Sequence, residues 1–105
     1  KRRFVEKVDY ITSPGFIRGG DTRAESGLIA GGMYRVVTDL AILGFDEKTK
    51  EMRVEALHPG VDPEEVKDNT GFDIEIGDHV ARTETPQEAE LAVLRNLDPD
   101  RLYTA

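Results

Sequence analysis

The fold is decided by residues 34–57, which read YRVVTDLAILGF, then DEKTK, then EMRVEAL. Two strand-like runs around a short charged run predict a β-hairpin. The second run alternates, with charged residues facing out and Met52 and Val54 facing in, as in a strand with one buried face. The turn has no Asn-Gly or Asp-Gly pair, so we expect a loop of about four or five residues around a type I turn. The first run is apolar on both faces from Ala41 to Leu43, which predicts an internal strand of a larger sheet.

The bulk composition fits one small domain of 105 residues. A net charge of −7 argues against nucleic acid, whose phosphates require Lys and Arg. With no cysteine and two histidines, disulfides, thiolate catalysis and cysteine-based or histidine-rich metal sites are excluded. No apolar run approaches the ~20 residues of a membrane span, and no signal peptide is visible. We therefore expect a cytoplasmic protein, and the opening KRR without a methionine suggests a piece of a longer polypeptide.

Upstream of the hairpin, residues 7–12 are rich in strand formers and predict a short strand that stops at Ser13-Pro14-Gly15. Residues 16–32 are predicted to form a long loop. It contains five glycines, at positions 19, 20, 27, 31 and 32. Such a loop is either a plain surface or interface loop, or one whose backbone amides contact a ligand. Its spacing matches neither the dinucleotide fingerprint nor the phosphate-binding P-loop.

Downstream of the hairpin, Asp62 as N-cap and Pro63 at the first helical position predict a short helix. The run Asn69-Thr70-Gly71 ends it, with Gly71 as the C′ residue. Residues 72–76 alternate between apolar and acidic side chains, which predicts a strand closed by GDH.

Residues 80–85 are a polar connection to a second helix, with Thr85 as N-cap and Glu88 completing a capping box. This helix ends before Asp98 and carries an apolar stripe, which consists of Ala89, Val93, Leu94 and Leu97. The order strand, long loop, hairpin, helix, strand, helix predicts an α/β fragment with a mixed sheet.

No catalytic constellation is visible. Carboxylate pairs such as Glu64-Glu65 lie in a helix first turn, and nothing in the sequence brings any pair together in a cleft. Ser13 and Ser26 have no evident base. His58, next to a turn, is expected to be a structural hydrogen-bonding residue.

Two motifs together resemble family I CoA-transferases, specifically the β-type chain of the glutaconate CoA-transferases: KVDYITSPGF at 7–16 and NTGFD at 69–73. The resemblance continues through VVTD at 36–39, FDEKTK at 45–50 and PEEV at 63–66, in the family's order. It implies that residues 1–105 are a C-terminal segment of a CoA-transferase β-subunit-like domain.

The resemblance also implies the chemistry. In this family a glutamate carboxylate attacks an acyl-CoA, and a glutamyl-CoA thioester forms through an acyl-glutamyl anhydride. That glutamate belongs to the N-terminal part of the β chain and matches nothing here, so we expect no catalytic residue and no activity from the 105 residues alone. Coenzyme A is a substrate, no cofactor or metal is expected, and the partner is an α subunit. The acid that accepts CoA stays open.

Two alternatives stand beside the transferase. Some relatives are hydrolases that open a steroid-derived ring on a CoA thioester, and the isolated segment could instead be a non-catalytic interaction module. Uncovered strand edges would then predict self-association. The residues we expect nearest CoA, from backbone access alone, are Ser13, Gly15, Gly19 and Gly20.

Overall fold

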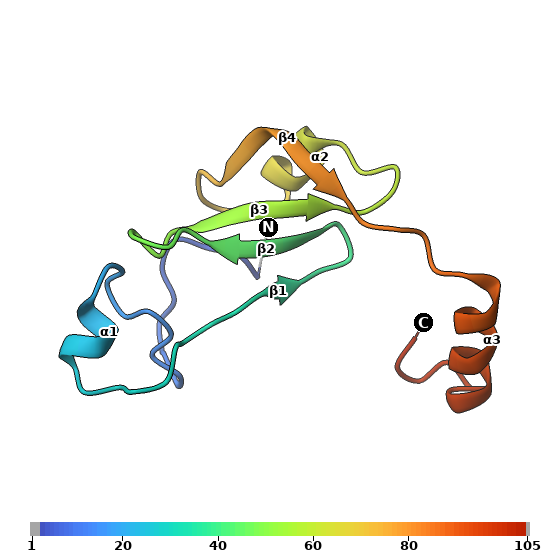
Figure 1. Ribbon diagram of the computed structural model, residues 1–105, viewed down its shortest axis with the longest axis horizontal. Coiled ribbons are helices and arrows are strands. Elements are labelled where there is room, and N and C mark those ends of the chain that lie inside the picture. Colours follow the sequence, from blue (N-terminus) through green and yellow to red (C-terminus); the bar gives the residue numbers. More distant parts are fainter. Residues whose placement is uncertain (1–2, 105) are drawn as a thin grey trace.

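The computed structural model describes residues 3–104 and is built on a mixed four-stranded sheet of order β1-β2-β3-β4 (Figure 1). The strands are β1 (Val36–Val37), β2 (Ala41–Phe45), β3 (Met52–Leu57) and β4 (Glu75–Arg82). The helices are α1 (Thr22–Glu25), α2 (Pro63–Asp68) and α3 (Glu88–Leu97). The first three strands pair antiparallel, whereas β3 and β4 run parallel. The predicted mixed sheet is therefore confirmed.

The predicted hairpin is confirmed as β2 and β3. The Asp46 amide donates to the Glu51 carbonyl at 2.9 Å, and the Asp46 carboxylate accepts the amides of Lys48 and Thr49 at 2.8 and 2.7 Å. The Asp46 side chain thus stabilises the connection through an Asx-turn, in which its carboxylate takes the place of a backbone carbonyl.

The prediction of one long first strand is wrong, because residues 34–45 form both β1 and β2. Thr38 causes the break: its hydroxyl accepts the amides of Leu40 and Ala41 at 3.2 and 3.0 Å. These local bonds close a turn that folds β1 back onto β2.

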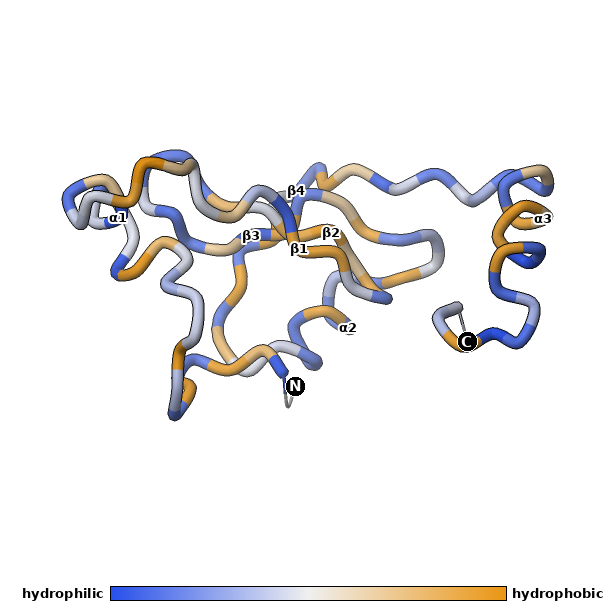
Figure 2. Tube along the Cα trace, turned by 90° about the horizontal axis from the view of Figure 1, so that it is seen from below, coloured by the Kyte–Doolittle hydropathy of each residue, from blue (hydrophilic) through white to orange (hydrophobic). Residues whose placement is uncertain are grey.

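The core lies between the sheet and α2, which covers one face of the sheet (Figures 1 and 2). Its buried members are Ala41, Leu43, Val54, Leu57, Val61, Val66 and Ile74. Ile42 is only half-buried, so within this chain the predicted burial of both faces of the first run is not reached. Val54 is buried as predicted, and beyond the predicted run Leu57 is buried in place of Ala56, because the register against β2 shifts between Ile42 and Leu43.

The strand predicted at residues 7–12 is wrong. Val8, Tyr10 and Ile11 are 57%, 81% and 67% exposed, and the segment pairs with no strand among the described residues. The N-terminal segment is tied instead at one parallel bridge between Val5 and Gly71. Residues 7–12 therefore have strand propensity but form no strand, because no neighbouring strand provides backbone hydrogen bonds to them.

Gly71 is not the C′ residue of α2, which ends at Asn69 as C-cap. The Gly71 amide donates to the Phe4 carbonyl at 2.7 Å, and a Cβ at Gly71 would collide with that backbone. Glycine is needed here for close approach of two backbone segments. At the other end of α2, Asp62 is the N-cap residue as predicted, although its side chain makes no capping hydrogen bond.

The strand predicted at 72–76 begins later, at Glu75, and runs to Arg82, so Gly77-Asp78-His79 does not close it and residues 80–82 are not connection. Against β3, Val54 pairs with Ile76 and Ala56 with Ala81. The residues between form a bulge within β4. The glycine marks an interruption of pairing and not the end of the strand.

The last helix, α3, begins at Glu88 with a capping box formed by Gln87 and Glu90, and not by Thr85 and Glu88. Its end before Asp98 is confirmed. The helix stands away from the sheet at one end of the molecule, with the α1 loop at the other (Figure 1). The radius of gyration is accordingly 16.5 Å, against about 13 Å for a compact chain of this size.

Candidate functional site

The four residues expected near coenzyme A lie in one loop before α1. Ser13 is exposed, and Gly15 has a φ of +54° that favours glycine. The Gly15 carbonyl accepts a hydrogen bond from Nη1 of Arg23 at 2.7 Å. Nε of Arg23 donates a second hydrogen bond to the Ala30 carbonyl at 2.8 Å. Arg23 therefore holds the two sides of the loop together.

The amides of Gly19 and Gly20 are already used within the chain. Gly19 donates to the Phe16 carbonyl at 2.9 Å, and Gly20 donates to the Thr49 carbonyl at 3.0 Å. Gly19 has a φ of +82°, and a Cβ there would overlap the Thr49 carbonyl. In this conformation these glycines dock the loop on the β2–β3 turn, and the assignment of all four residues to CoA stays a prediction.

Phe16 fixes the loop to the hairpin through its ring. The Phe16 and Phe45 rings meet edge to face, with centroids 5.0 Å apart and planes at 66°. The Lys50 ammonium lies 5.7 Å from the Phe16 centroid, and the ring also leaves no room for a side chain at Gly32. The glycine-rich loop is therefore a folded unit resting on the hairpin end.

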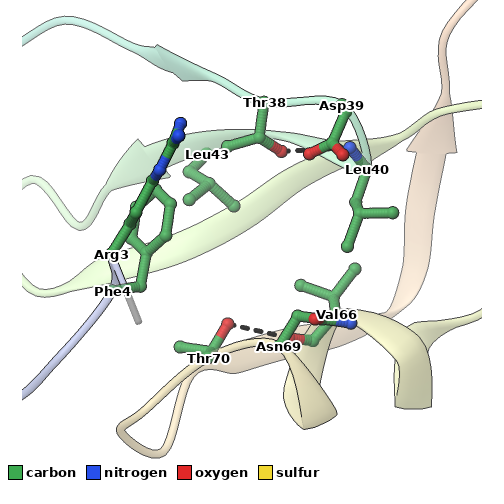
Figure 3. A pocket seen from close by; sticks show the side chains of 9 residues that line it. All are labelled: Arg3, Phe4, Thr38, Asp39, Leu40, Leu43, Val66, Asn69 and Thr70. Carbon is green, nitrogen blue, oxygen red and sulfur yellow. Dashed lines mark hydrogen bonds between the residues drawn. The ribbon is translucent and has the colours of Figure 1, made fainter. Parts of the chain in front are cut away.

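A pocket of about 530 Å³ opens between α2, the β1–β2 turn and the N-terminal segment (Figure 3). It is lined by Arg3, Phe4, Thr38, Asp39, Leu40, Leu43, Val66, Asn69 and Thr70. Its lining combines apolar side chains with two opposite charges, Arg3 and Asp39 (Figure 3). Five of the nine lining residues are polar or charged, so the lining is mixed and differs from the mostly apolar form that is usual for a small-molecule site.

Sequence reasoning missed this pocket. The sequence predicts a strand through Thr38 and Asp39 and a helix end at Asn69 and Thr70, with nothing to bring the two together. The pocket forms because the Val5–Gly71 bridge brings the N-terminal segment beside α2, and no local pattern indicates that contact.

The charged side chains of β3 are paired with one another. Arg53 binds Glu55 at 3.1 Å and approaches Asp46 at 3.9 Å. The hydrogen bond to Glu55 raises the pKa of Arg53, and the Thr49 and Lys48 amides lower the pKa of Asp46. Glu55 also lies across Gly44, where a Cβ would collide with it. Both carboxylates, Asp46 and Glu55, are engaged in structural bonds within the chain and are poorly placed for acid–base work.

His58 is the structural hydrogen-bonding residue that was predicted. Its Nε2 donates to the Thr38 carbonyl at 2.9 Å, which leaves Nδ1 to accept the Thr83 hydroxyl at 2.7 Å in the neutral ring. Arg82 adds bonds to the carbonyls of His58 and Val61 at 3.2 and 2.6 Å. The ring thereby joins the β1–β2 turn, the end of β3 and the segment leaving β4.

Within residues 3–104, no group of three or more His, Cys, Asp or Glu side chains could hold a metal ion. The described helices are all too short or too polar to cross a membrane.

Comparison with known proteins gives strong similarity to enzyme subunits, although no family model matches. The chain is 45% identical over 105 residues to the B subunit of glutaconate CoA-transferase from Acidaminococcus fermentans, covering 98% of this chain and 39% of that protein. It is 42% identical over 97 residues to the B subunit of 3-oxoadipate CoA-transferase from Pseudomonas knackmussii, covering 92% and 37%. It is 34% identical over 103 residues to the IpdB subunit of the cholesterol ring-cleaving hydrolase from Mycobacterium tuberculosis, covering 97% and 40%.

Solved structures agree. The crystal structure of glutaconate coenzyme A-transferase from Acidaminococcus fermentans superposes with a TM-score of 0.89 at 43% identity, over 100% of this chain and 41% of that one. Rhodococcus jostii IpdAB superposes with a TM-score of 0.56 at 36% identity, over 65% and 28%. The chain thus spans about two fifths of the length of the curated relatives it matches.

Proposed function

We propose, from the premise that the chain belongs to the family of glutaconate CoA-transferase B subunits, that it is a segment of a protein that transfers coenzyme A between an acyl-CoA and a carboxylic acid. The nucleophilic glutamate of that reaction would lie outside residues 1–105. The segment would contribute to the enzyme its sheet and the loop that packs on the hairpin. It would also provide a surface that contacts other parts of the enzyme. A cytoplasmic location stays a prediction.

The observation that carries this proposal is similarity along the whole chain. The folded loop and the projecting α3 both fall within the full-length superposition on the transferase, at a TM-score of 0.89. The hydrolase superposes over 65% of the chain with a TM-score of 0.56. A hydrolase that opens a ring on a CoA thioester is the second candidate, supported by 34% identity over 103 residues.

A transfer assay on the complete protein separates the two candidates. The full-length chain is combined with its A-type partner and incubated with acetyl-CoA and either glutaconate or 3-oxoadipate. We expect formation of the new acyl-CoA with release of acetate, whereas a hydrolase that opens a ring on a CoA thioester would leave acetyl-CoA and the acid unchanged. Absence of any transfer from the assembled complete protein would overturn the proposal.

Within that assay, two serine variants test the loop. If the predicted contact of Ser13 with CoA is made, S13A should raise KM for acyl-CoA by roughly 2- to 10-fold, the effect of one lost hydrogen bond. Ser26, in the same loop region, bonds only the Thr22 carbonyl through its hydroxyl within the described chain, so S26A is the matched control. Equal KM values for both variants would remove Ser13 from the site.

A further inference from the structure

Arg23 joins the two sides of the loop that surrounds α1. Its Nη1 donates to the Gly15 carbonyl, eight residues earlier in the chain, and its Nε donates to the Ala30 carbonyl, seven residues later. The side chain is half-buried, and it makes no ion pair with the carboxylates of residues 3–104. The guanidinium is thus used to bind two main-chain carbonyls, which suits its rigid fork of donors.

The stem of the Arg23 side chain is also held in place. A Cβ added to Gly32 would lie 3.2 Å from Cδ of Arg23 and 2.6 Å from the Phe16 ring. Gly32 has a φ of +86°, so the main chain passes the stem in a conformation that favours glycine. Arg23 is therefore packed along its stem and hydrogen-bonded at its tip.

Thr22, the neighbour of Arg23, fixes the inner part of the same loop. Its hydroxyl donates to the Gly19 carbonyl at 2.6 Å and accepts a hydrogen bond from the Arg18 amide at 3.2 Å. With four residues, α1 is too short to be stable as an isolated helix. Its first two residues instead bind the loop, so α1 and the loop form one folded unit.

Segment 13–15 depends on Arg23 for its position. The Pro14 carbonyl accepts the Ile17 amide in the adjoining turn. Among the described residues, the bond from Arg23 to Gly15 is the one hydrogen bond that ties this segment to a more distant part of the chain. Within residues 3–104, neither the Ser13 hydroxyl nor the Gly15 amide is hydrogen-bonded, so both are available to a ligand.

We propose that Arg23 is a positioning residue for coenzyme A, and that its guanidinium holds segment 13–15 in the conformation that binds CoA. This role rests on the proposed function and on the contact of Ser13 and Gly15 with CoA that the sequence predicts. Arg23 itself contacts no substrate in this arrangement. It acts through the Gly15 main chain, and Pro14, with its fixed φ, joins Gly15 to Ser13.

Preorganisation is the physical reason for such a role. Gly15 has a φ of +54°, and glycine loses more conformational freedom on ordering than any other residue. Without the bond from Arg23, segment 13–15 would have to be ordered each time CoA binds, and that loss of entropy lowers the affinity. The chemical step is unaffected, because the proposed nucleophile would lie outside residues 1–105.

Substitutions of Arg23 and Arg18 test this role in the full-length chain combined with its A-type partner. R23M removes both hydrogen bonds. Arg18 is an exposed arginine of the same loop whose guanidinium makes no hydrogen bond to the described residues, so R18M is the matched control. In R23M we expect KM for acetyl-CoA to rise roughly 5- to 50-fold, with kcat within about twofold of the wild type. R18M should keep both values.

The variant R23K separates the hydrogen bonds from the charge. Lysine keeps the positive charge but has a methylene in the place of Nε, so the bond to Ala30 is lost. We expect R23K to raise KM for acetyl-CoA in the same direction as R23M. A wild-type KM in R23K, together with a raised KM in both R23M and R18M, would mean that the loop attracts CoA by charge and would overturn the proposal.

Hydrogen exchange gives a readout that does not depend on catalysis. The Ile17 amide adjoins segment 13–15, whereas the His58 amide bonds the Leu40 carbonyl at the other end of the hairpin. In R23M we expect exchange at Ile17 to become roughly tenfold faster, with exchange at His58 unchanged. Unchanged exchange at Ile17 would show that Arg23 does not hold the segment. If R23M also loses protection at His58, its fold is disturbed and R23K carries both readouts.

Failure of this role and failure of the proposed function give different results. Faster exchange at Ile17 with a wild-type KM for acetyl-CoA, in an enzyme that transfers CoA, would contradict the role of Arg23 alone. Absence of transfer by the wild-type complex would remove the proposed function and, with it, the role of Arg23 in binding. The exchange rates would still report whether Arg23 holds segment 13–15.

Discussion

His58 and Thr83 form a side-chain contact that links the segment after β4 to the end of β3 and the β1–β2 turn. T83V keeps the shape of the side chain and removes its hydroxyl, so Nδ1 of His58 loses its partner in a half-buried site. We expect a loss of about 1–2 kcal/mol in the free energy of unfolding, measured by urea denaturation.

Thr85 offers the matched control for that substitution. It lies in the same segment, is exposed, and its hydroxyl makes no hydrogen bond to the described residues. T85V should leave stability within about 0.5 kcal/mol of the wild type. A T83V protein as stable as T85V would mean that the His58 contact contributes nothing.

Asp98 predicts a pH dependence at the C-terminal tail. Burial alone would raise the pKa of its carboxyl, but hydrogen bonds from Tyr103, Thr104 and Leu102 outweigh burial and lower the pKa below the ordinary 3.8. The folded tail therefore binds fewer protons than the unfolded one. Its stabilisation is complete above pH 3.8 and is lost as the pH falls through the lowered pKa.

The amide chemical shifts of Leu102, Tyr103 and Thr104 report this transition in an NMR titration. We expect them to move together below pH 3.8, toward the values of an unfolded tail. D98N should show no such transition, because an amide does not titrate in this range. A midpoint at or above 3.8 in the wild-type protein would contradict the lowered pKa.

At the scale of elements, the docking of the glycine loop on the hairpin depends on Gly19. Gly19 and Gly27 have nearly equal φ values, +82° and +78°, so alanine costs both positions roughly 1–2 kcal/mol of backbone strain. A Cβ at Gly27 meets open space, whereas at Gly19 it would overlap the Thr49 carbonyl. G19A should therefore destabilise the protein more than G27A.

The same pair of variants distinguishes local strain from undocking. In G19A we expect the Gly20–Thr49 hydrogen bond and the Phe16–Phe45 contact to be lost, with shifted NMR signals for Thr49 and Phe45. G27A should leave both signals unchanged. Equal effects of the two substitutions would show that the loop does not need the close approach at Gly19.

Elements with local signals were predictable, and those that depend on distant partners were not. The hairpin, α2 with Asp62 and Pro63, and the end of α3 follow from alternation and cap residues. The segment 7–12 has strand formers but no neighbouring strand, so the prediction failed there. Gly71 and Gly77 both looked like terminators, yet one serves a close backbone approach and the other a bulge within β4.

For the whole molecule, a mixed sheet with helices was predictable from the order of elements, and the similarity to CoA-transferase B subunits from motifs such as KVDYITSPGF. The pocket beside Phe4 and Asn69 was not, because it depends on a contact between distant parts of the chain. The sequence left open whether the loop glycines contact a ligand through their backbone amides. Two of those amides bond within the chain, which only the fold could reveal.

The bulge in β4 has a consequence for aggregation. β4 is the longer of the two edge strands of the sheet, and an edge of unpaired amides invites chain after chain to add on. Its bulge, together with Asp78 and His79 in that interruption, breaks the straight ladder such growth requires. A regular strand edge would propagate into a fibre, and the interruption between Ile76 and Ala81 removes that regularity.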